Sequence, residues 1–265
     1  MVLLGFWFAG GFGWLDRIVR GWADGTVLRG LAFIGLLVVG KMILNLPFSA
    51  YSTFVIEERF GFNRTTWKTF VLDFVKGLTL GILIGGPLLG AVIFVLDRLG
   101  PSGWLACWAI TVAVMLVIQY VAPKWIMPLF NKFTPLDSGE LRDRITGYAD
   151  TVGFPLQGVY VIDGSRRSSK ANAFFTGFGK NRRIALYDTL IERHETDELV
   201  AVLAHEIGHY KRHHILQGMI ISIVHTGILF LVLSFVLPSE GLFEAFGVAS
   251  GTPVYAGLVF FGLLY

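Results

Sequence analysis

The chain has 265 residues, of which 54% are hydrophobic and only 15% are charged. A mean hydropathy of +0.64 excludes an ordinary soluble domain. The net charge of +3 is not gathered into a basic stripe with interleaved aromatic residues, so nucleic acid is not an expected partner. The single cysteine, Cys107, excludes a disulfide framework and is expected to be a small buried hydrophobe.

Apolar runs that approach the roughly 20 residues needed to cross a bilayer recur along the chain. Four are predicted as membrane-spanning helices, over 27–48, 71–96, 102–122 and 215–237. Shorter apolar runs lie at the two ends, over 1–15 and 253–265. The first lacks the basic start and the cleavage site of a signal peptide. The last is expected to be a helix that is cut short.

The basic residues predict the orientation of these spans. With the six runs taken in order, 49–70 and 123–214 share one side of the membrane and hold most of the Lys and Arg residues outside the spans. The other side holds only Arg17, Arg20 and Arg98. We therefore expect a multi-pass protein with 123–214 on the cytoplasmic side of a bacterial inner membrane or of the endoplasmic reticulum.

Two charged residues near the start of the second span have a simpler expected role. Asp73 and Lys76 lie one helical turn apart, a spacing that predicts an ion pair at the membrane interface.

Three regions follow from this pattern: transmembrane helices over 1–122, a polar domain over 123–214, and transmembrane helices over 215–265. The polar domain is predicted to be a small α+β domain. Its expected elements are a helix over 141–152 ended by Gly153, a strand over 158–162, a hairpin of 172–176 and 183–186 closed by 177–181, and a short helix with a capping box of Thr189 and Glu192.

The next helix carries the sequence His205-Glu206-Ile207-Gly208-His209. Residues four apart lie one above the other on a helix, so His205 and His209 can present two imidazoles to one metal ion. Glu206 then lies close enough to act on a water bound to that metal. This H-E-x-x-H pattern is typical of zinc hydrolases in which the two histidines are Zn²⁺ ligands and the glutamate is the general base. Thr196 is the expected N-cap of this helix.

A catalytic zinc takes three protein ligands, and the sequence offers no convincing third one. His213 lies about 12 Å further along the helix axis than His205, too far to share an ion. His213 and His214 are instead expected at the interface or as supports for the ligands. Glu240 and Glu244 are weak candidates.

The predicted hairpin before this helix has two open interpretations. A free strand edge at Asn172, Ala173 and Phe174 can take a substrate backbone as an added strand beside the metal. The alternative is a hairpin that only packs against the helix.

Five stretches of the sequence together resemble the type I CAAX prenyl endopeptidases, a family of integral-membrane zinc proteases. They are LPFSAY at 46–51, TFVIEERFGFN at 53–63, PLFNKF at 128–133, NAFF at 172–175 and LAHEIGH at 203–209. The resemblance implies a mostly α, polytopic helical membrane protein with a small α+β zinc-protease domain between the spans. It also implies one bound Zn²⁺ and removal of the last three residues after a prenylated cysteine in a C-a-a-X tail.

Carried over position by position, the resemblance makes His205 and His209 zinc ligands, Glu206 the base, and Asn172, Ala173 and Phe174 the strand that aligns the substrate. The chain departs from the family at Lys170 and Ala171, where members usually have a histidine and a serine. The family's third ligand is a glutamate on a later helix, and members have a further N-terminal span. We therefore expect both ends of such a protein to be missing here.

Other functions share parts of this pattern. A membrane quality-control metalloprotease that acts on damaged membrane proteins would use the same chemistry. A protease with its site inside the bilayer is disfavoured by Lys211 and Arg212 directly after the motif. A non-enzymatic scaffold that lacks the third zinc ligand would bind hydrophobic tails without cleaving them.

Overall fold

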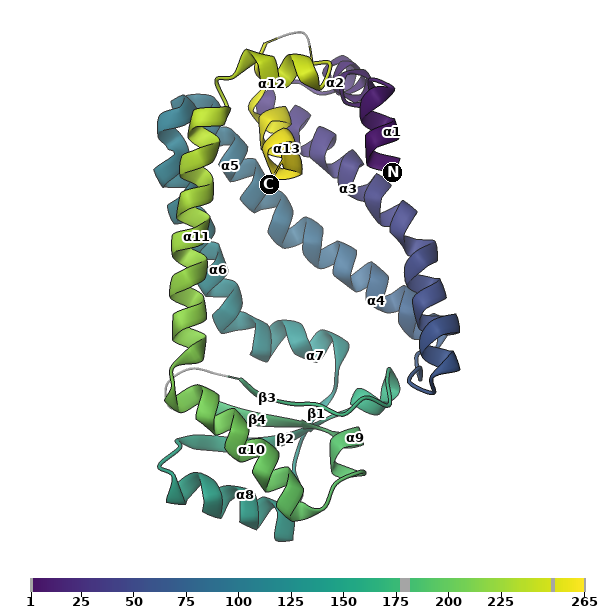
Figure 1. The fold of residues 1–265 in the computed structure, drawn as a ribbon, viewed down its shortest axis with the longest axis vertical. Coiled ribbons are helices and arrows are strands. Elements are labelled where there is room, and N and C mark those ends of the chain that lie inside the picture. The colour runs from purple at the N-terminus through teal and green to yellow at the C-terminus, as the bar shows by residue number, and fades with distance from the viewer. Residues whose placement is uncertain (1, 177–181, 249–250, 265) are drawn as a thin grey trace. The chain divides into compact units, whose positions relative to one another are not determined.

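The structure is a computed structural model that describes residues 2–176, 182–248 and 251–264. Helices dominate it (Figure 1), and their bounds are α1 (Val2–Phe8), α2 (Gly11–Trp22), α3 (Thr26–Tyr51), α4 (Trp67–Leu80), α5 (Gly86–Leu99), α6 (Trp104–Val121), α7 (Met127–Phe130), α8 (Glu140–Thr151), α9 (Asp188–Ile191), α10 (Thr196–Lys211), α11 (His214–Val236), α12 (Glu240–Ala245) and α13 (Val254–Leu264). The strands are β1 (Phe133–Pro135), β2 (Leu156–Ile162), β3 (Ala173–Thr176) and β4 (Arg182–Tyr187).

In the described residues, three helical stretches are long and apolar enough to cross a membrane. They are Thr26–Glu57, Trp67–Phe130 and His214–Val236, and the bent pair α1 and α2 makes a fourth if it counts as one span. Three of the four predicted spans fall within the long stretches, and the fourth, 215–237, extends one residue beyond Val236. The predicted fold class, a polytopic helical membrane protein with a small α+β part, is confirmed.

The chain divides into two compact units. The first consists of Met1–Pro47, Leu78–Met115 and Ile221–Tyr265, and the second of Phe48–Gly77 and Leu116–Ile220. The second unit contains the predicted polar segment 123–214 together with the end of α3 and most of α4.

The first unit is held by aromatic packing between helices distant in sequence. Phe12, Phe33 and Tyr255 are buried in one cluster. The Tyr255 hydroxyl donates a 2.6 Å hydrogen bond to the buried carboxylate of Asp16. Gly30 of α3 lets Tyr255 pack closely against this helix, because a Cβ at position 30 would lie only 2.8 Å from the Cβ of Tyr255. A second cluster in this unit buries Cys107 completely, as the sequence predicts.

The second unit is built on a four-stranded sheet of order β1-β2-β4-β3. β2 and β4 are parallel, and the outer strands β1 and β3 are antiparallel to their neighbours. The predicted strand and both arms of the predicted hairpin are present, whereas its closing segment 177–181 lies outside the described residues. β1 was not predicted. It has only three residues and includes a proline, which an edge strand tolerates because one side needs no backbone donor.

The core of the second unit lies between the sheet and the helices α8 and α10. Ile184 and Leu186 alternate along β4 and are buried against Leu203 and Ile207 of α10 and Ile145 of α8. Burial of each of these five side chains stabilises the folded state by roughly 1.5–3 kcal/mol. This core therefore fixes the position of α10 against the sheet.

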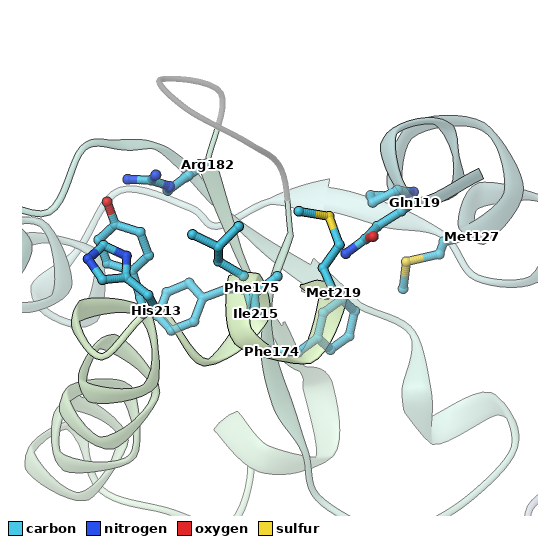
Figure 2. A pocket seen from close by; sticks show the side chains of 11 residues that line it. Gln119, Met127, Phe174, Phe175, Arg182, His213, Ile215 and Met219 are labelled. Carbon is cyan, nitrogen blue, oxygen red and sulfur yellow. The ribbon is translucent and has the colours of Figure 1, made fainter. Parts of the chain in front are cut away.

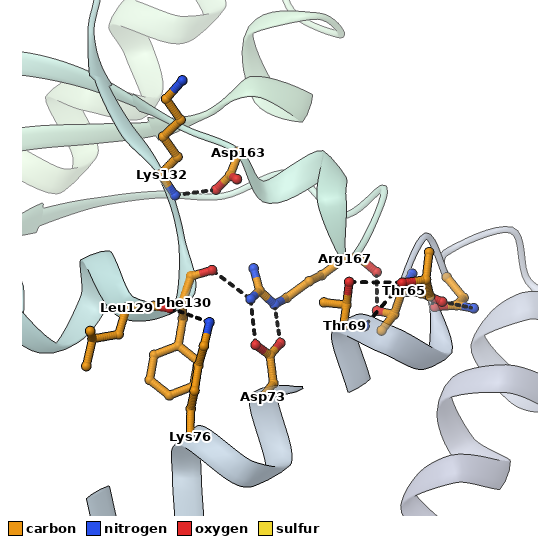
Figure 3. Close-up of polar contacts among 11 residues, drawn as sticks. Thr65, Thr69, Asp73, Lys76, Leu129, Phe130, Lys132, Asp163 and Arg167 are labelled. Atoms are coloured by element: carbon orange, nitrogen blue, oxygen red, sulfur yellow. Dashed lines mark hydrogen bonds and ion pairs between the residues drawn. The ribbon is translucent and has the colours of Figure 1, made fainter. Parts of the chain in front are cut away.

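Two local predictions in the second unit are wrong. Asp73 pairs with Arg167 through two hydrogen bonds of 2.7 and 2.9 Å, while Lys76 donates to the carbonyl of Leu129 (Figure 3). A bidentate guanidinium is the better partner for a carboxylate than a lysine one turn away. Thr189 does not cap α9, because its buried hydroxyl donates to the carbonyl of Lys170.

Candidate metal centre

The H-E-x-x-H sequence lies on α10, whose first turn is fixed by a capping box. The Glu195 carboxylate accepts the backbone N–H of Glu198, and the Glu198 carboxylate accepts that of Glu195 at 3.1 Å. The predicted N-cap, Thr196, is therefore wrong: Thr196 is the first helical residue. The His194 imidazole and the Glu195 N–H both hydrogen bond to the Glu198 carboxylate and lower its pKa.

A sharp turn ends α10. His213 has a φ of +56°, the left-handed conformation usually taken by glycine, and its N–H donates to the carbonyl of Tyr210 at 2.8 Å. The turn lets α11 begin directly at His214.

The two motif histidines face each other, with 3.1 Å between the Nε2 atoms of His205 and His209. Two Zn–N bonds of about 2.0–2.1 Å at the tetrahedral angle would place the nitrogens about 3.3 Å apart. Both imidazoles are exposed. The pair therefore fits two ligand positions of one zinc ion almost without rearrangement.

His214 supports this pair from the start of α11. Its Nδ1 lies 2.7 Å from Nδ1 of His209, the nitrogen that faces away from His205. If His209 donates its proton to His214, then Nε2 of His209 keeps its lone pair for a metal. The turn at His213 creates this contact, whereas the sequence predicted only an interfacial or supporting role for His214.

Glu206 is half-buried on the same helix, next to His205. Within the described residues, no third His, Cys, Asp or Glu joins the two histidines in a metal-binding group. The weak candidates Glu240 and Glu244 are the first and the last but one residue of α12, in the first unit. The described part of the chain thus supplies two donors of the three that a catalytic zinc takes.

The predicted substrate-binding residues lie at the start of the outer strand β3. The Asn172 carbonyl accepts the N–H of Tyr187, so this residue directs its backbone groups toward β4. The backbone N–H and C=O groups of successive residues in a strand point to alternate sides. The backbone groups of Ala173 and Phe175 therefore point to the outer edge of the sheet. The Ala173 N–H is occupied there by the side-chain oxygen of Asn172 at 2.9 Å. In the described residues, no strand pairs with this outer edge.

The two positions that depart from the family pattern precede this strand. Lys170 forms a 2.7 Å ion pair with Glu57 and lies over the ring of Phe62. Its charge is thus engaged within the second unit by residues of the 53–63 stretch.

A cavity of about 500 Å³ lies beside β3 and the end of α10 (Figure 2). It is mostly apolar, and its lining residues are Gln119, Pro123, Met127, Phe174, Phe175, Arg182, Tyr210, His213, Ile215, Leu216 and Met219. The sequence did not predict this cavity, because its lining residues come from three separate segments of the chain. Arg182 among them follows a turn-rich segment and belongs to no recognised motif.

Known proteins resemble this chain along nearly its whole length. A family model described as the CAAX prenyl protease N-terminal region, with five membrane helices, matches residues 1–132, and the model of peptidase family M48 matches residues 135–265. CAAX prenyl protease 1 of Saccharomyces cerevisiae is 44% identical over 226 residues, which cover 84% of this chain and 49% of that protein. A human homologue of CAAX prenyl protease 1 is 33% identical over 270 residues, covering 88% of this chain and 57% of that protein.

A solved structure agrees with these matches. The crystal structure of S. mikatae Ste24p superimposes with a TM-score of 0.92 at 37% identity, covering 98% of this chain and 65% of that one. The chain spans about half the length of the curated relatives it matches. Because the two family models lie end to end over almost all of the sequence, the chain belongs to the CAAX prenyl protease family of M48 peptidases.

Proposed function

We propose that this protein is a membrane-embedded zinc metalloendopeptidase that removes the C-terminal tripeptide from prenylated proteins ending in a C-a-a-X sequence. The observation that carries the proposal is the facing pair His205 and His209, with Glu206 beside it, on a helix that contacts the outer strand β3. The relatives named CAAX prenyl protease support the substrate class.

In this mechanism, His205 and His209 would hold zinc, since their Nε2 atoms face each other. A bound zinc ion would polarise the scissile carbonyl and lower the pKa of a water molecule. Glu206 takes a proton from the attacking water at its carboxylate and passes it to the nitrogen of the leaving amine. The peptide C–N bond breaks, the prenylated cysteine keeps a new carboxylate, and the tripeptide leaves with a free amine.

The outer edge of β3 aligns the substrate in this proposal. Asn172 directly precedes β3, and Ala173 and Phe174 are the first two residues of this strand, against which an extended peptide adds as a further strand. Substrate binding would displace the Asn172 side chain from the Ala173 N–H, since that donor points to the open edge.

The site is proposed to face the cytoplasm. The spans are flanked on its side by Lys124, Lys132, Lys211 and Arg212, as expected for residues that stay on the cytoplasmic face and near its anionic lipids.

The test compares substrates on the protein expressed from its complete gene in membranes. A farnesylated C-a-a-X peptide should release its tripeptide, whereas the same peptide without the lipid should be cleaved far more slowly. Equal cleavage of both, or preferential cleavage of an unfolded membrane protein, would contradict the proposal and favour the quality-control function.

A further inference from the structure

The cavity of Figure 2 runs along the open edge of β3. Phe174 and Phe175 are neighbours on this strand, so their side chains point to opposite faces of the sheet. A cavity that both of them line must pass around the strand's edge. Residues of α6 and α7, among them Gln119 and Met127, form its opposite wall. The cavity therefore lies where an added strand would be placed.

Arg182 supplies the charge in this apolar cavity. It is the first residue of β4 and points to the same face as Ile184 and Leu186, the face that packs against α10. Its guanidinium lies 3.9 Å from the centre of the Tyr210 ring. Stacking of this kind fixes the plane of the guanidinium and leaves its N–H groups along the edge available.

Arg182 has no ion-pair partner among the described residues. A half-buried cation in a mostly apolar cavity is costly unless an anion joins it. Figure 2 shows His213, a second polar group, at the same end of the cavity. The arrangement has the composition of an anion site, with a bidentate donor held on an aromatic face.

The position of Arg182 relative to His205 and His209 indicates which anion its guanidinium would bind. Tyr210, under the guanidinium, directly follows His209 in α10. A tripeptide leaving group carries its terminal carboxylate within about 10 Å of the scissile bond, the reach of three extended residues. A peptide along the open edge of β3 can therefore place its reacting carbonyl at the histidines and its terminus in the cavity.

We propose that Arg182 binds the C-terminal carboxylate of the substrate and that this contact makes the protein select free chain ends. The proposal rests on the function given above and adds a specificity residue to it. Tyr210 positions the guanidinium, and the apolar wall takes the side chains of the leaving residues.

The test measures binding of a dye-labelled farnesylated C-a-a-X peptide with either a free carboxylate or a carboxamide at its end. The protein from its complete gene should bind the acid at least about tenfold more tightly, as expected for a charge-assisted bidentate pair. In Arg182→Gln this ratio should fall to near one, while affinity for the amide is kept. Because the ratio is taken within each variant, partial misfolding does not produce the result.

Arg183→Gln is the matched control. Arg183 is the next residue on β4, points to the opposite face, and contacts Gln157 and the ring of Tyr160. This variant should keep the full preference for the acid. The proposal is overturned if the wild type binds acid and amide equally or if the preference survives in Arg182→Gln.

The outcome separates the two proposals. Tripeptide release from acid and amide peptides with the same KM would leave the proposed function standing and overturn the role of Arg182. An Arg182-dependent preference for the acid, with no tripeptide release, would support the carboxylate site and remove the proposed function.

Discussion

Glu206 and His205 are neighbours in the chain but have separable roles in the proposed site. Glu206→Gln keeps both imidazoles, so zinc content should be unchanged while turnover falls by about 10²- to 10⁴-fold, the usual contribution of a general base. His205→Ala removes one of two described nitrogen donors and should lower zinc content itself. Metal analysis and peptide turnover on the same preparations check both expectations. Normal turnover by Glu206→Gln would remove this residue from the base role.

His214 acts through His209, so its effect should appear in metal affinity before activity. His214→Ala removes the group at 2.7 Å from His209 Nδ1 and should weaken zinc binding about 10- to 100-fold, as the loss of a hydrogen bond to a ligand does. Competition with a zinc-binding dye measures this change.

His194→Ala is the control for the loss of an imidazole from the same region. His194 is paired with Glu198 at the start of α10 and has no described contact with the metal pair. Unchanged zinc affinity in His214→Ala, or an equal loss in His194→Ala, would contradict the supporting role of His214.

Among the secondary-structure elements, those with a strong local signal were predicted well. The helix over 141–152 corresponds to α8, with Gly153 at φ +64° after its end, and the two β-prone runs form β3 and β4. The N-cap of α10 was wrong, because a reciprocal contact of two glutamates replaces the usual Ser, Thr or Asp cap. The contact between His214 and His209 depends on the neighbouring His213, which adopts a left-handed conformation typical of glycine. A sequence pattern does not reveal this conformation.

The pairing of Asp73 with Arg167 ties α4 to the loop after β2. Both side chains are about three-quarters buried, at 25% and 23% exposed, and Arg167 also donates to the Phe130 carbonyl. The pairing raises the pKa of Arg167, so it stays charged throughout the usual pH range. Asp73→Asn should therefore lower the free energy of local opening by about 2 kcal/mol, since it leaves a partly buried charge unpaired.

Hydrogen exchange of the amides in 164–169 measures that opening, and about 2 kcal/mol corresponds to roughly 30-fold faster exchange. Lys76→Gln removes the hydrogen bond to the Leu129 carbonyl and the cation–π contact with the Phe130 ring, but keeps the Asp73–Arg167 pair, so it should leave these amides nearly unchanged. Equal exchange in Asp73→Asn and the wild type would show that the ion pair does not hold the loop.

For the whole molecule, hydropathy predicted the helical spans because lipid requires long apolar helices, whatever their neighbours. The basic flanks predict the side of the site, and only two zinc donors come together in the described residues. A third donor depends on tertiary contacts that local spacing does not encode.

The predicted topology can be tested by labelling introduced cysteines. The native Cys107 is fully buried and should give little background. In sealed vesicles, an impermeant maleimide on the cytoplasmic face should label Asp137→Cys, in an exposed loop of the second unit, and should not label Ser239→Cys, just before α12. The reverse pattern would place the metal pair on the other side of the membrane.

The most direct measurement of the central proposal is mass spectrometry of a farnesylated C-a-a-X peptide incubated with membranes that contain the wild type or Glu206→Gln. The proposal predicts that the wild type releases the intact C-terminal tripeptide and leaves a free carboxylate on the farnesylated cysteine, and that Glu206→Gln releases almost none. Cleavage at another bond, or equal tripeptide release by both proteins, would contradict it.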